Sequence, residues 1–447
     1  MIALPVIPIR ATTGLEAPAA PLGGERGRLV LGICLTLLLA FSTATMFIRA
    51  AWALEFFQIG AFALVAVYLL AGIGRDKEQL ASGWSPWLVY LIPVWGLLQL
   101  LAHATASSME TRQAVLRWGA LSGVFLLSQV AARTATGQHR MLSGFLIFAV
   151  AMAVLCLTQL FTSAGRVLWI FPTGYPDVYG TFPSYNNYAQ FAELALPIAL
   201  WRALNEGWRS WWYALAGGVL YASVIGAASR AGTVLCTAEL LAMMAIGLIR
   251  FRDPETGRLP RSTVAMLVMV PVLAAVFTFA VGWERVWLRF QQHNPYLVRR
   301  EYLLAAADMA WQRPLTGYGL GTFPEVYQRY AIKDFPFYAN HVHNDWAEFA
   351  ADGGVPFLLL VLIPFAACVP AAIRYPWGLG LVAIMLHACV DFPFPRPAVS
   401  GWMFLLLGLL SMARSPDGCG DEAFTAFGAS GGPSQGAASQ PVQFVSF

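Results

Sequence analysis

Residues 141–162 read MLSGFLIFAVAMAVLCLTQLFT, a run of 22 residues without a charged side chain. As a helix, a run of this length would extend about 33 Å, which is enough to cross the roughly 30 Å hydrocarbon core of a bilayer. The composition of the whole chain agrees, because 58% of its 447 residues are hydrophobic and only 12% are charged. A soluble globular domain carries about twice that share of charge. We therefore expect an integral membrane protein.

Twelve such runs, bounded by charges or turn residues, predict an all-α polytopic membrane protein with about twelve transmembrane helices. The fourth run contains Arg117 and the eleventh ends in a proline-rich turn, so these two fit the pattern least well. The runs cover residues 29–48, 51–74, 84–102, 114–131, 141–162, 187–204, 210–228, 231–249, 263–283, 354–373, 376–392 and 398–413.

The runs divide the chain into five parts. These are an N-terminal segment 1–28, nine spans within 29–283, a long loop 284–353, three spans within 354–413, and a tail 414–447. The tail is rich in Gly, Ser, Ala and Gln, which predicts disorder. Residues 1–28 lack the apolar core of a cleavable signal peptide.

Charge and cysteine content exclude several other classes of protein. The net charge of +4 is small and scattered, which argues against nucleic acid as a partner. The six cysteines lie far apart and form no C-x-x-C motif, so we expect neither a disulfide framework nor a zinc site.

The distribution of Lys and Arg orients the predicted spans. With the N-terminus in the cytoplasm, the inner segments carry fifteen of these residues and the short outer segments carry six. The other seven lie in 284–340, a loop too long for the rule to apply. Both termini are therefore predicted to be cytoplasmic. Four polar stretches, 179–187, 229–232, 284–343 and 391–397, then meet at the outer face and suggest a site there.

Arginines in two of these stretches are candidates for anion binding. Arg299 and Arg300 open a predicted helix that ends before Pro314, and their guanidinium groups suit a phosphate or a carboxylate. A lipid-headgroup anchor is the alternative. Arg230 lies between two apolar runs with almost no loop, where an arginine is costly unless it is paired or faces a wet cavity. Its alternative is a helix-end arginine that reaches the membrane surface.

Histidines and carboxylates follow in the segment from His341 to Asp352. His343 is a candidate general base, because the ordinary pKa of histidine lies near neutrality. His341, Asn344, Asp345 and Asp352 are candidate supporting residues. The spacing of the two histidines matches no strong metal-binding template, so no metal site is predicted, and a structural role for both histidines stays open.

Two further pairs could support the site. Asn186 and Asn187 lie at the start of a predicted helix, where asparagine often serves only as a cap. His387 lies four residues before Asp391, a spacing that would place both side chains on one face of a helix. The two could support the site, or they could form a buried structural pair.

Taken together, these stretches resemble the O-antigen ligase superfamily of membrane glycosyltransferases, which includes lipid-linked glycan polymerases and protein O-oligosaccharyltransferases. The resemblance covers about residues 175–400. Two positions depart from the family pattern, since Asp352 stands where Glu is usual and Phe357 where Gly is common. The matching elements, in family order, are Gly180-Thr-Phe182 with Asn186-Asn-Tyr-Ala189; Ser229-Arg-Ala-Gly232; Arg299 with Met309 and Pro314-Leu-Thr-Gly-Tyr-Gly319; His343-Asn-Asp-Trp346 with Gly354-Val-Pro356; and His387 with Asp391-Phe-Pro393.

The resemblance implies a GT-C-like fold in the bacterial inner (cytoplasmic) membrane with a periplasmic active site. The reaction would move a saccharide from undecaprenyl diphosphate to a hydroxyl of lipid A–core or another glycan, among membrane lipids and without a metal or cofactor. Arg230 and Arg299, with Arg300, would neutralise the diphosphate, and His343 would remove the acceptor proton. The chain has no Asp-rich metal motif, in agreement with that scheme.

The first functional hypothesis is a ligase that transfers a lipid-linked polysaccharide to lipid A–core. A polymerase that joins lipid-linked repeat units is the second, and transfer to a protein Ser or Thr is the third. A lipid or ion transporter is the alternative from another class. It is disfavoured because the charges gather at the outer face and no inverted repeat is evident.

Overall fold

The computed structural model describes residues 24–71, 85–173, 178–206, 209–252, 256–291, 296–333 and 338–413. Helices account for 77% of these residues, and the described part of the chain contains no β-strand, only two isolated bridges. The expected all-α class is therefore confirmed. The predicted tail 414–447 and all but the last five residues of the predicted N-terminal segment 1–28 lie outside the described residues.

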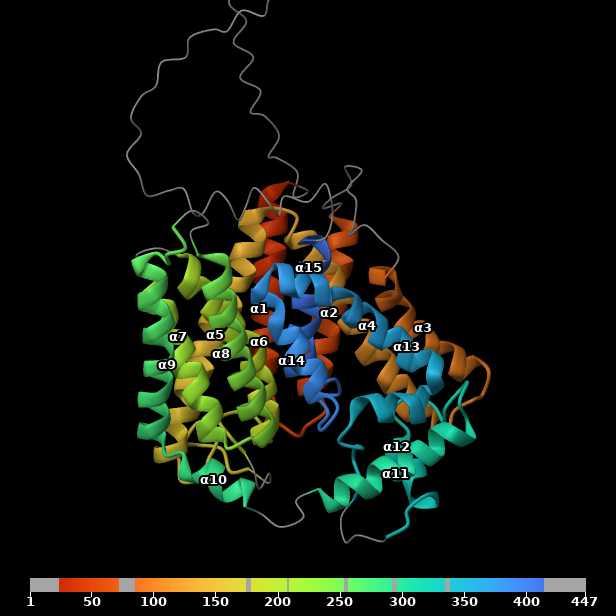
Figure 1. The fold of residues 1–447 in the computed structure, drawn as a ribbon. Coiled ribbons are helices and arrows are strands. Elements are labelled where there is room, and N and C mark those ends of the chain that lie inside the picture. The colour runs from red at the N-terminus through yellow and green to blue at the C-terminus, as the bar shows by residue number, and fades with distance from the viewer. Residues whose placement is uncertain are drawn as a thin grey trace, which may run out of the picture.

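The helices follow one another with short connections over most of the chain (Figure 1). The first half contains α1 (Glu25–Ala44), α2 (Trp52–Leu70), η1 (Ser85–Trp87), α3 (Leu88–Leu101), α4 (Ser108–Ala131), α5 (Ala135–Thr162), α6 (Tyr185–Asn205) and α7 (Ser210–Ala227). The second half contains α8 (Arg230–Arg250), α9 (Arg261–Val281), α10 (Glu284–Phe290), α11 (Leu297–Gln312), α12 (Phe323–Val326), η3 (Tyr327–Arg329), α13 (Asp345–Arg374), η4 (Pro376–Gly378), α14 (Leu379–His387) and α15 (Pro397–Ala413).

Each of the twelve predicted apolar runs coincides with a helix of the structure. Seven of these helices are long and apolar enough to cross a membrane, namely α1, α2, α4, α5, α8, α9 (from Thr263) and α13. The other predicted runs coincide with helices that are shorter or less apolar. The polytopic character of the protein is thus supported, and the number of twelve crossings stays a prediction.

The helices alternate in direction, so that their ends gather at two opposite ends of the molecule. The Oγ1 atom of Thr181 donates to the carbonyl of Thr43, which joins the stretch before α6 to the last turn of α1. At the opposite end, the guanidinium of Arg250 donates to the carbonyls of Ile373 and Arg374. The first of these two ends carries α10, α11 and α12 (Figure 1), and the four polar stretches meet there.

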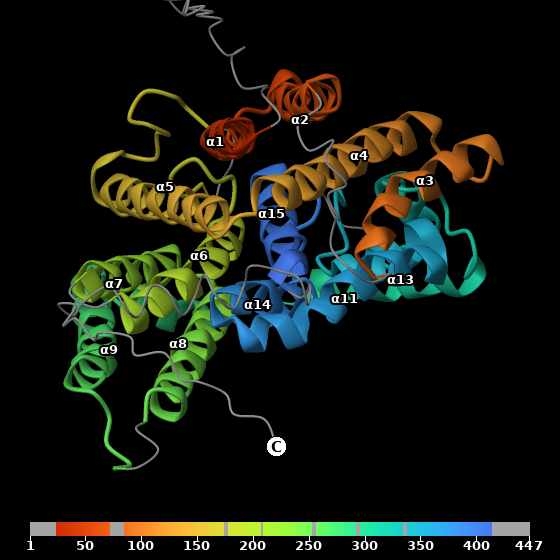
Figure 2. The same ribbon diagram turned by 90° about the horizontal axis from the view of Figure 1, so that it is seen from above.

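Helix α15 forms the centre of the helical bundle (Figure 2). Every residue from Ala398 to Ser411 is buried, as expected for a helix that is apolar on all sides. The ring of Trp402 stacks on Phe145 with 4.3 Å between the ring centroids, and its Nε1 atom donates to Thr43 at 3.0 Å. This packing fixes the loop 388–396, which precedes α15 and carries Asp391.

Helix α13 begins nine residues before the predicted tenth run and bends at the predicted start of that run. Asn344 caps the helix, because its Oδ1 atom accepts from the backbone N–H of Ala347 at 3.0 Å. The bend lies at Gly354, whose φ of 71° lies in the left-handed region. A Cβ atom there would come within 2.7 Å of the Pro314 carbonyl oxygen, so only glycine fits. The first arm of α13 therefore belongs to the end that carries α10–α12.

Candidate active site

Two helix starts meet at this end and carry the first site residues. Ser184 caps α6 and Ser229 caps α8, each through a side-chain oxygen that accepts a backbone N–H. The hydroxyl of Ser229 also donates to the Oδ1 atom of Asn186 at 2.8 Å. This hydrogen bond joins two stretches that lie 43 residues apart in the sequence.

Asp391 is the centre of a hydrogen-bonded group. Its side chain is buried in the loop between α14 and α15. Its Oδ1 atom lies 3.1 Å from Nδ1 of His343 and accepts from its neighbour Phe392 N–H at 3.0 Å. Its Oδ2 atom accepts from the amide of Asn186 and lies 3.8 Å from the guanidinium of Arg299. One carboxylate therefore connects residues that precede α13, open α6 and belong to α11.

Ionisation of Asp391 depends on these partners. Burial alone would raise the pKa of the carboxyl group. The hydrogen bond with His343 and the positive charge of Arg299 outweigh burial and hold the pKa of Asp391 well below its usual range. Asp391 is therefore a carboxylate at neutral pH and acts only as a hydrogen-bond acceptor.

His343 has the geometry of a general base. An ionised carboxylate accepts but cannot donate, so the neutral ring carries its hydrogen on Nδ1, toward Asp391. The Nε2 atom is then the proton acceptor, and the side chain is 30% exposed. The backbone of His343 has a φ of 59°, a left-handed conformation that non-glycine residues seldom adopt.

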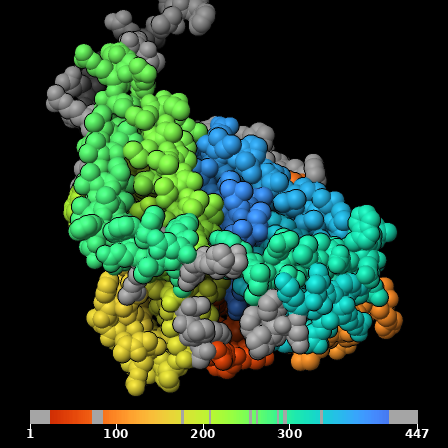
Figure 3. Space-filling model, turned by 60° about the horizontal axis from the view of Figure 1, so that its bottom comes forward, coloured from red at the N-terminus to blue at the C-terminus, as the bar shows by residue number. Residues whose placement is uncertain are grey.

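A pocket of about 180 Å³ lies next to this group. Arg230 of α8, Arg289 of α10 and Arg299 of α11 all line it, together with Asn186 and Tyr296. In Figure 3, which brings this end forward, the green surface of α9 and α10 and the teal surface of α11 and α12 lie on either side of the blue C-terminal segments.

The three arginines are held by aromatic rings and backbone. Arg230 and Arg299 lie 5.6 Å and 5.9 Å from the centroid of the Tyr296 ring, and Arg289 lies 4.6 Å from that of Tyr185. The Nη1 atom of Arg299 also donates to the Val390 carbonyl at 2.6 Å. Three guanidinium groups around one pocket suit an anion with several oxygens, such as a phosphate or diphosphate.

Four of the predicted supporting residues shape the backbone around His343. His341 lies 2.9 Å from Glu348 through Nδ1, and its ring stacks on the ring of Phe392. Asn344 is the α13 cap described above. Asp345 accepts the N–H of Phe394 at 3.0 Å, and Asp352 accepts the N–H of Gly321 at 2.8 Å. None of the four lines the arginine pocket.

Three other predicted residues lie away from the pocket. Asn187 is buried and donates to Gln190. His387 does not bond the side chain of Asp391, because its Nδ1 atom lies 2.7 Å from Glu193 and both side chains are fully buried. Arg300 is exposed and does not line the pocket, since consecutive residues of a helix point about 100° apart.

Arg289 is the pocket arginine that sequence reasoning missed. It belongs to none of the motifs, and the only signal was its place in a loop rich in Trp, Tyr and Phe. Among the residues that the structure describes, no group of three or more His, Cys, Asp or Glu side chains is placed to hold a metal ion.

A family model matches part of the chain. Residues 214–362, which are 149 of the 447 residues, match the family model described as O-antigen ligase. The matched range contains the three pocket arginines and His343, and it supports membership of the O-antigen ligase superfamily. No curated protein and no solved structure matches the chain.

Proposed function

We propose that this protein of the O-antigen ligase superfamily transfers a saccharide from undecaprenyl diphosphate to a hydroxyl of lipid A–core. The transfer would take place at the periplasmic face of the bacterial inner membrane. The observation that carries the proposal is the pocket with three arginines beside the His343–Asp391 pair. Such a pair of features serves a reaction in which one group must lose a proton and another must leave as an anion.

The arginine pocket is proposed to bind the diphosphate of the donor. When the bond between the sugar C1 and the phosphate oxygen breaks, the bonding electrons stay on the diphosphate. Arg230, Arg289 and Arg299 would stabilise that negative charge. Arg299 donates one N–H group to the Val390 carbonyl and lies 3.8 Å from Asp391 as an ion pair. Its guanidinium has five N–H groups, so donors remain for a phosphate oxygen.

His343 is proposed to take the proton of the acceptor hydroxyl on Nε2 as the new bond from oxygen to C1 forms. Asp391 would hold the hydrogen on Nδ1 and stabilise the imidazolium that results. Asn186 would fix the second oxygen of Asp391, and Ser229 would fix Asn186. These last two residues are therefore assigned positioning roles, outside direct contact with the reacting atoms.

The position of the pocket at the helix ends supports substrates that are anchored in the membrane. The described part of the chain includes seven helices that are apolar and long enough to cross a bilayer, and α8, whose first residue is Arg230, is one of them. A lipid-linked donor would keep its hydrocarbon chain beside such helices and bring its diphosphate to their ends. An amphiphilic acceptor would reach the same level.

Two experiments test this function. Purified protein should transfer saccharide from a lipid-diphosphate donor to lipid A–core in vitro, and the His343→Ala variant should not. A deletion strain should lose all polymer on lipid A while lipid-linked polymer accumulates. Single-repeat caps on lipid A would instead make the protein a polymerase, and unchanged lipopolysaccharide with a change in protein glycosylation would make it a protein transferase.

A further inference from the structure

A second pocket lies between α1 and α5, at the end of the molecule opposite the arginine pocket. Its volume is about 170 Å³. The C-terminal parts of α1 and α5 lie at the end that carries the arginine pocket. There the carbonyl of Thr43 of α1 accepts from Thr181, and Cys156 of α5 contacts Tyr179. The residues that line this second pocket come from the first turns of both helices and the end of α4. No motif of the sequence marks this region.

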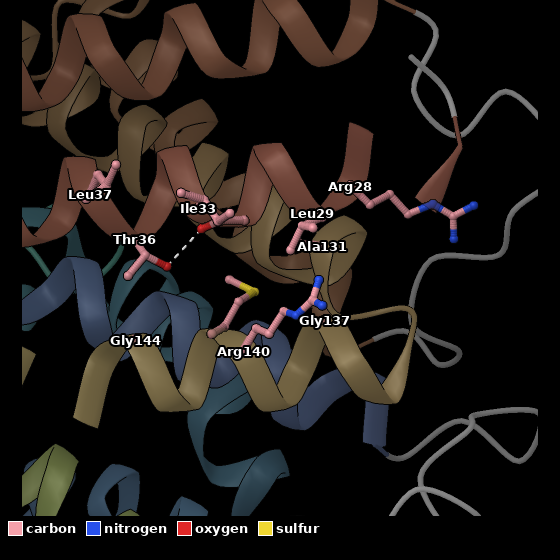
Figure 4. A pocket seen from close by; sticks show the side chains of 11 residues that line it. Arg28, Leu29, Ile33, Thr36, Leu37, Ala131, Gly137, Arg140 and Gly144 are labelled. Atoms are coloured by element: carbon pink, nitrogen blue, oxygen red, sulfur yellow. Dashed lines mark hydrogen bonds between the residues drawn. The ribbon is translucent and has the colours of Figure 1, made fainter. Parts of the chain in front are cut away.

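One end of the second pocket is lined by two arginines. Arg28 of α1 and Arg140 of α5 both line it (Figure 4). In the close view, Arg28 and the guanidinium of Arg140 lie toward one end, with Thr36, Leu37 and Gly144 toward the other. Arg28 and Leu37 are nine residues apart on one helix, so the pocket runs about 13 Å along α1.

The other end is apolar and open to the outside. Ile33 and Leu37, which line the pocket, are 49% and 62% exposed. The hydroxyl of Thr36 is satisfied within α1, because it donates to the carbonyl of Gly32 at 2.8 Å. Gly144 brings α5 so close to α1 that a Cβ atom there would lie 3.1 Å from Thr36. In a helix that crosses a membrane, such an opening faces hydrocarbon.

We propose that this pocket binds an anionic phospholipid. The headgroup phosphate would contact Arg28 and Arg140, and one acyl chain would lie along the apolar groove beside Thr36 and Leu37. A charged end and an apolar groove that opens toward hydrocarbon together match an amphiphile with an anionic head. A small soluble anion would use the arginines but leave the groove empty. This inference does not depend on the proposed transferase activity.

The test is native mass spectrometry of the purified full-length protein, titrated with phosphatidylglycerol or with phosphatidylcholine of the same acyl chains. Wild type is expected to bind phosphatidylglycerol more tightly. Arg140→Ala should weaken this binding about fivefold, or ~1 kcal/mol. Arg26→Ala is the matched control, because Arg26 lies on the same helix and does not line the pocket. Thr36→Phe, which fills the groove and keeps both arginines, should weaken it as well.

Several results would overturn the proposal. Equal affinity for the two lipids would show that the pocket does not recognise an anionic headgroup. An equal loss of lipid affinity in Arg26→Ala and Arg140→Ala would show that the lipid is attracted by the general positive charge of the surface. Wild-type affinity in Thr36→Phe would exclude the groove as the acyl-chain site. Displacement of the lipid by soluble glycerol phosphate would indicate a plain anion site.

A wild-type measurement covers the case in which a variant does not fold. Phosphatidylglycerol with a photoreactive group on its acyl chain should label peptides of α1 and α5 that line the groove. Labelling confined to other helices would refute the proposal.

Discussion

Replacement of Asp391 by Asn separates the orienting role of this carboxylate from its role in packing. Asn is nearly isosteric with Asp but exchanges one acceptor oxygen for a donor NH₂ group. The Oδ1 atom of Asp391 faces two donors, His343 Nδ1 and the N–H of Phe392. The Oδ2 atom faces two more, the amide of Asn186 and the guanidinium of Arg299. Wherever the new NH₂ group points, it therefore meets donors.

The expected loss in rate follows from these two arrangements. If the NH₂ group faces His343, Nδ1 becomes the acceptor and the hydrogen moves to Nε2, where it blocks removal of the acceptor proton. If the NH₂ group faces Arg299, the orientation of His343 survives, but the negative charge that stabilises the imidazolium is lost. Loss of a general base costs about 10²–10⁴ in rate, and the corresponding change in a Ser–His–Asp triad costs about 10⁴. We expect Asp391→Asn to lose at least about 10²-fold, which is ~2.7 kcal/mol.

Single-turnover transfer by purified protein, with donor occupancy measured in parallel, is the assay. Asp308→Asn is the matched control, because Asp308 is exposed on α11 and does not line the pocket. Asp391 stays ionised throughout the neutral pH range, since its pKa lies well below the usual range. Wild-type turnover by Asp391→Asn at full donor occupancy would refute the orienting role, and lost donor occupancy would move Asp391 to the donor site.

Three further predictions concern the base, the arginines and metals, and a fourth concerns orientation. His343→Ala should reduce single-turnover transfer about 10²–10⁴-fold with donor binding intact, whereas His341→Ala should cost far less; equal losses would contradict the assignment. Replacing any of the three pocket arginines by lysine should impair transfer nearly as much as replacing it by alanine, because lysine lacks the planar guanidinium group. Full activity of the lysine variants would show that only the positive charge at these positions matters. Transfer should persist in excess EDTA, and a strict requirement for Mg²⁺ or Mn²⁺ would mean that the acidic residues near His343 have been misinterpreted. Cysteines at positions 258 and 308 should be labelled from opposite sides of the membrane, and labelling of both from one side would exclude the predicted topology.

Hydrophobic runs predicted the helices well because a bilayer allows few other backbone structures. Their ends were harder to place. The helix that includes the tenth run begins at Asp345 rather than at 354, since the polar residues of its first arm are satisfied by partners that no local pattern reveals. Asp345 bonds Phe394 and Asp352 bonds Gly321, across 49 and 31 residues of sequence. When only neighbouring residues are considered, polar residues of this kind are predicted to lie in a loop.

The site was predictable to the extent that its residues form motifs. Arg230, Arg299 and His343 were identified in this way, and the structure places both arginines in one pocket. The partners of His387 and Asp391 were not predictable from their spacing of four residues. That spacing suggested a pair, but His387 bonds Glu193 from a helix 194 residues away in sequence, and Asp391 bonds His343 instead. Contacts between helices that are far apart in the sequence depend on how the helices pack. The residues next to a side chain in a single sequence do not reveal such a partner.

The three pocket arginines all lie at helix ends. An arginine in the middle of a membrane helix must be neutralised by a partner, because an unpaired charge in hydrocarbon is costly. Arg230 is the first residue of α8, Arg289 lies in the last turn of α10, and Arg299 is the third residue of α11. At helix ends, arginines can keep their charge in contact with water. Among the described residues that line the pocket none is acidic, and Asp391 lies 3.8 Å from only one of the guanidinium groups. Three guanidinium groups from three helix ends therefore line one pocket, and the carboxylate that lies near Arg299 also contacts His343.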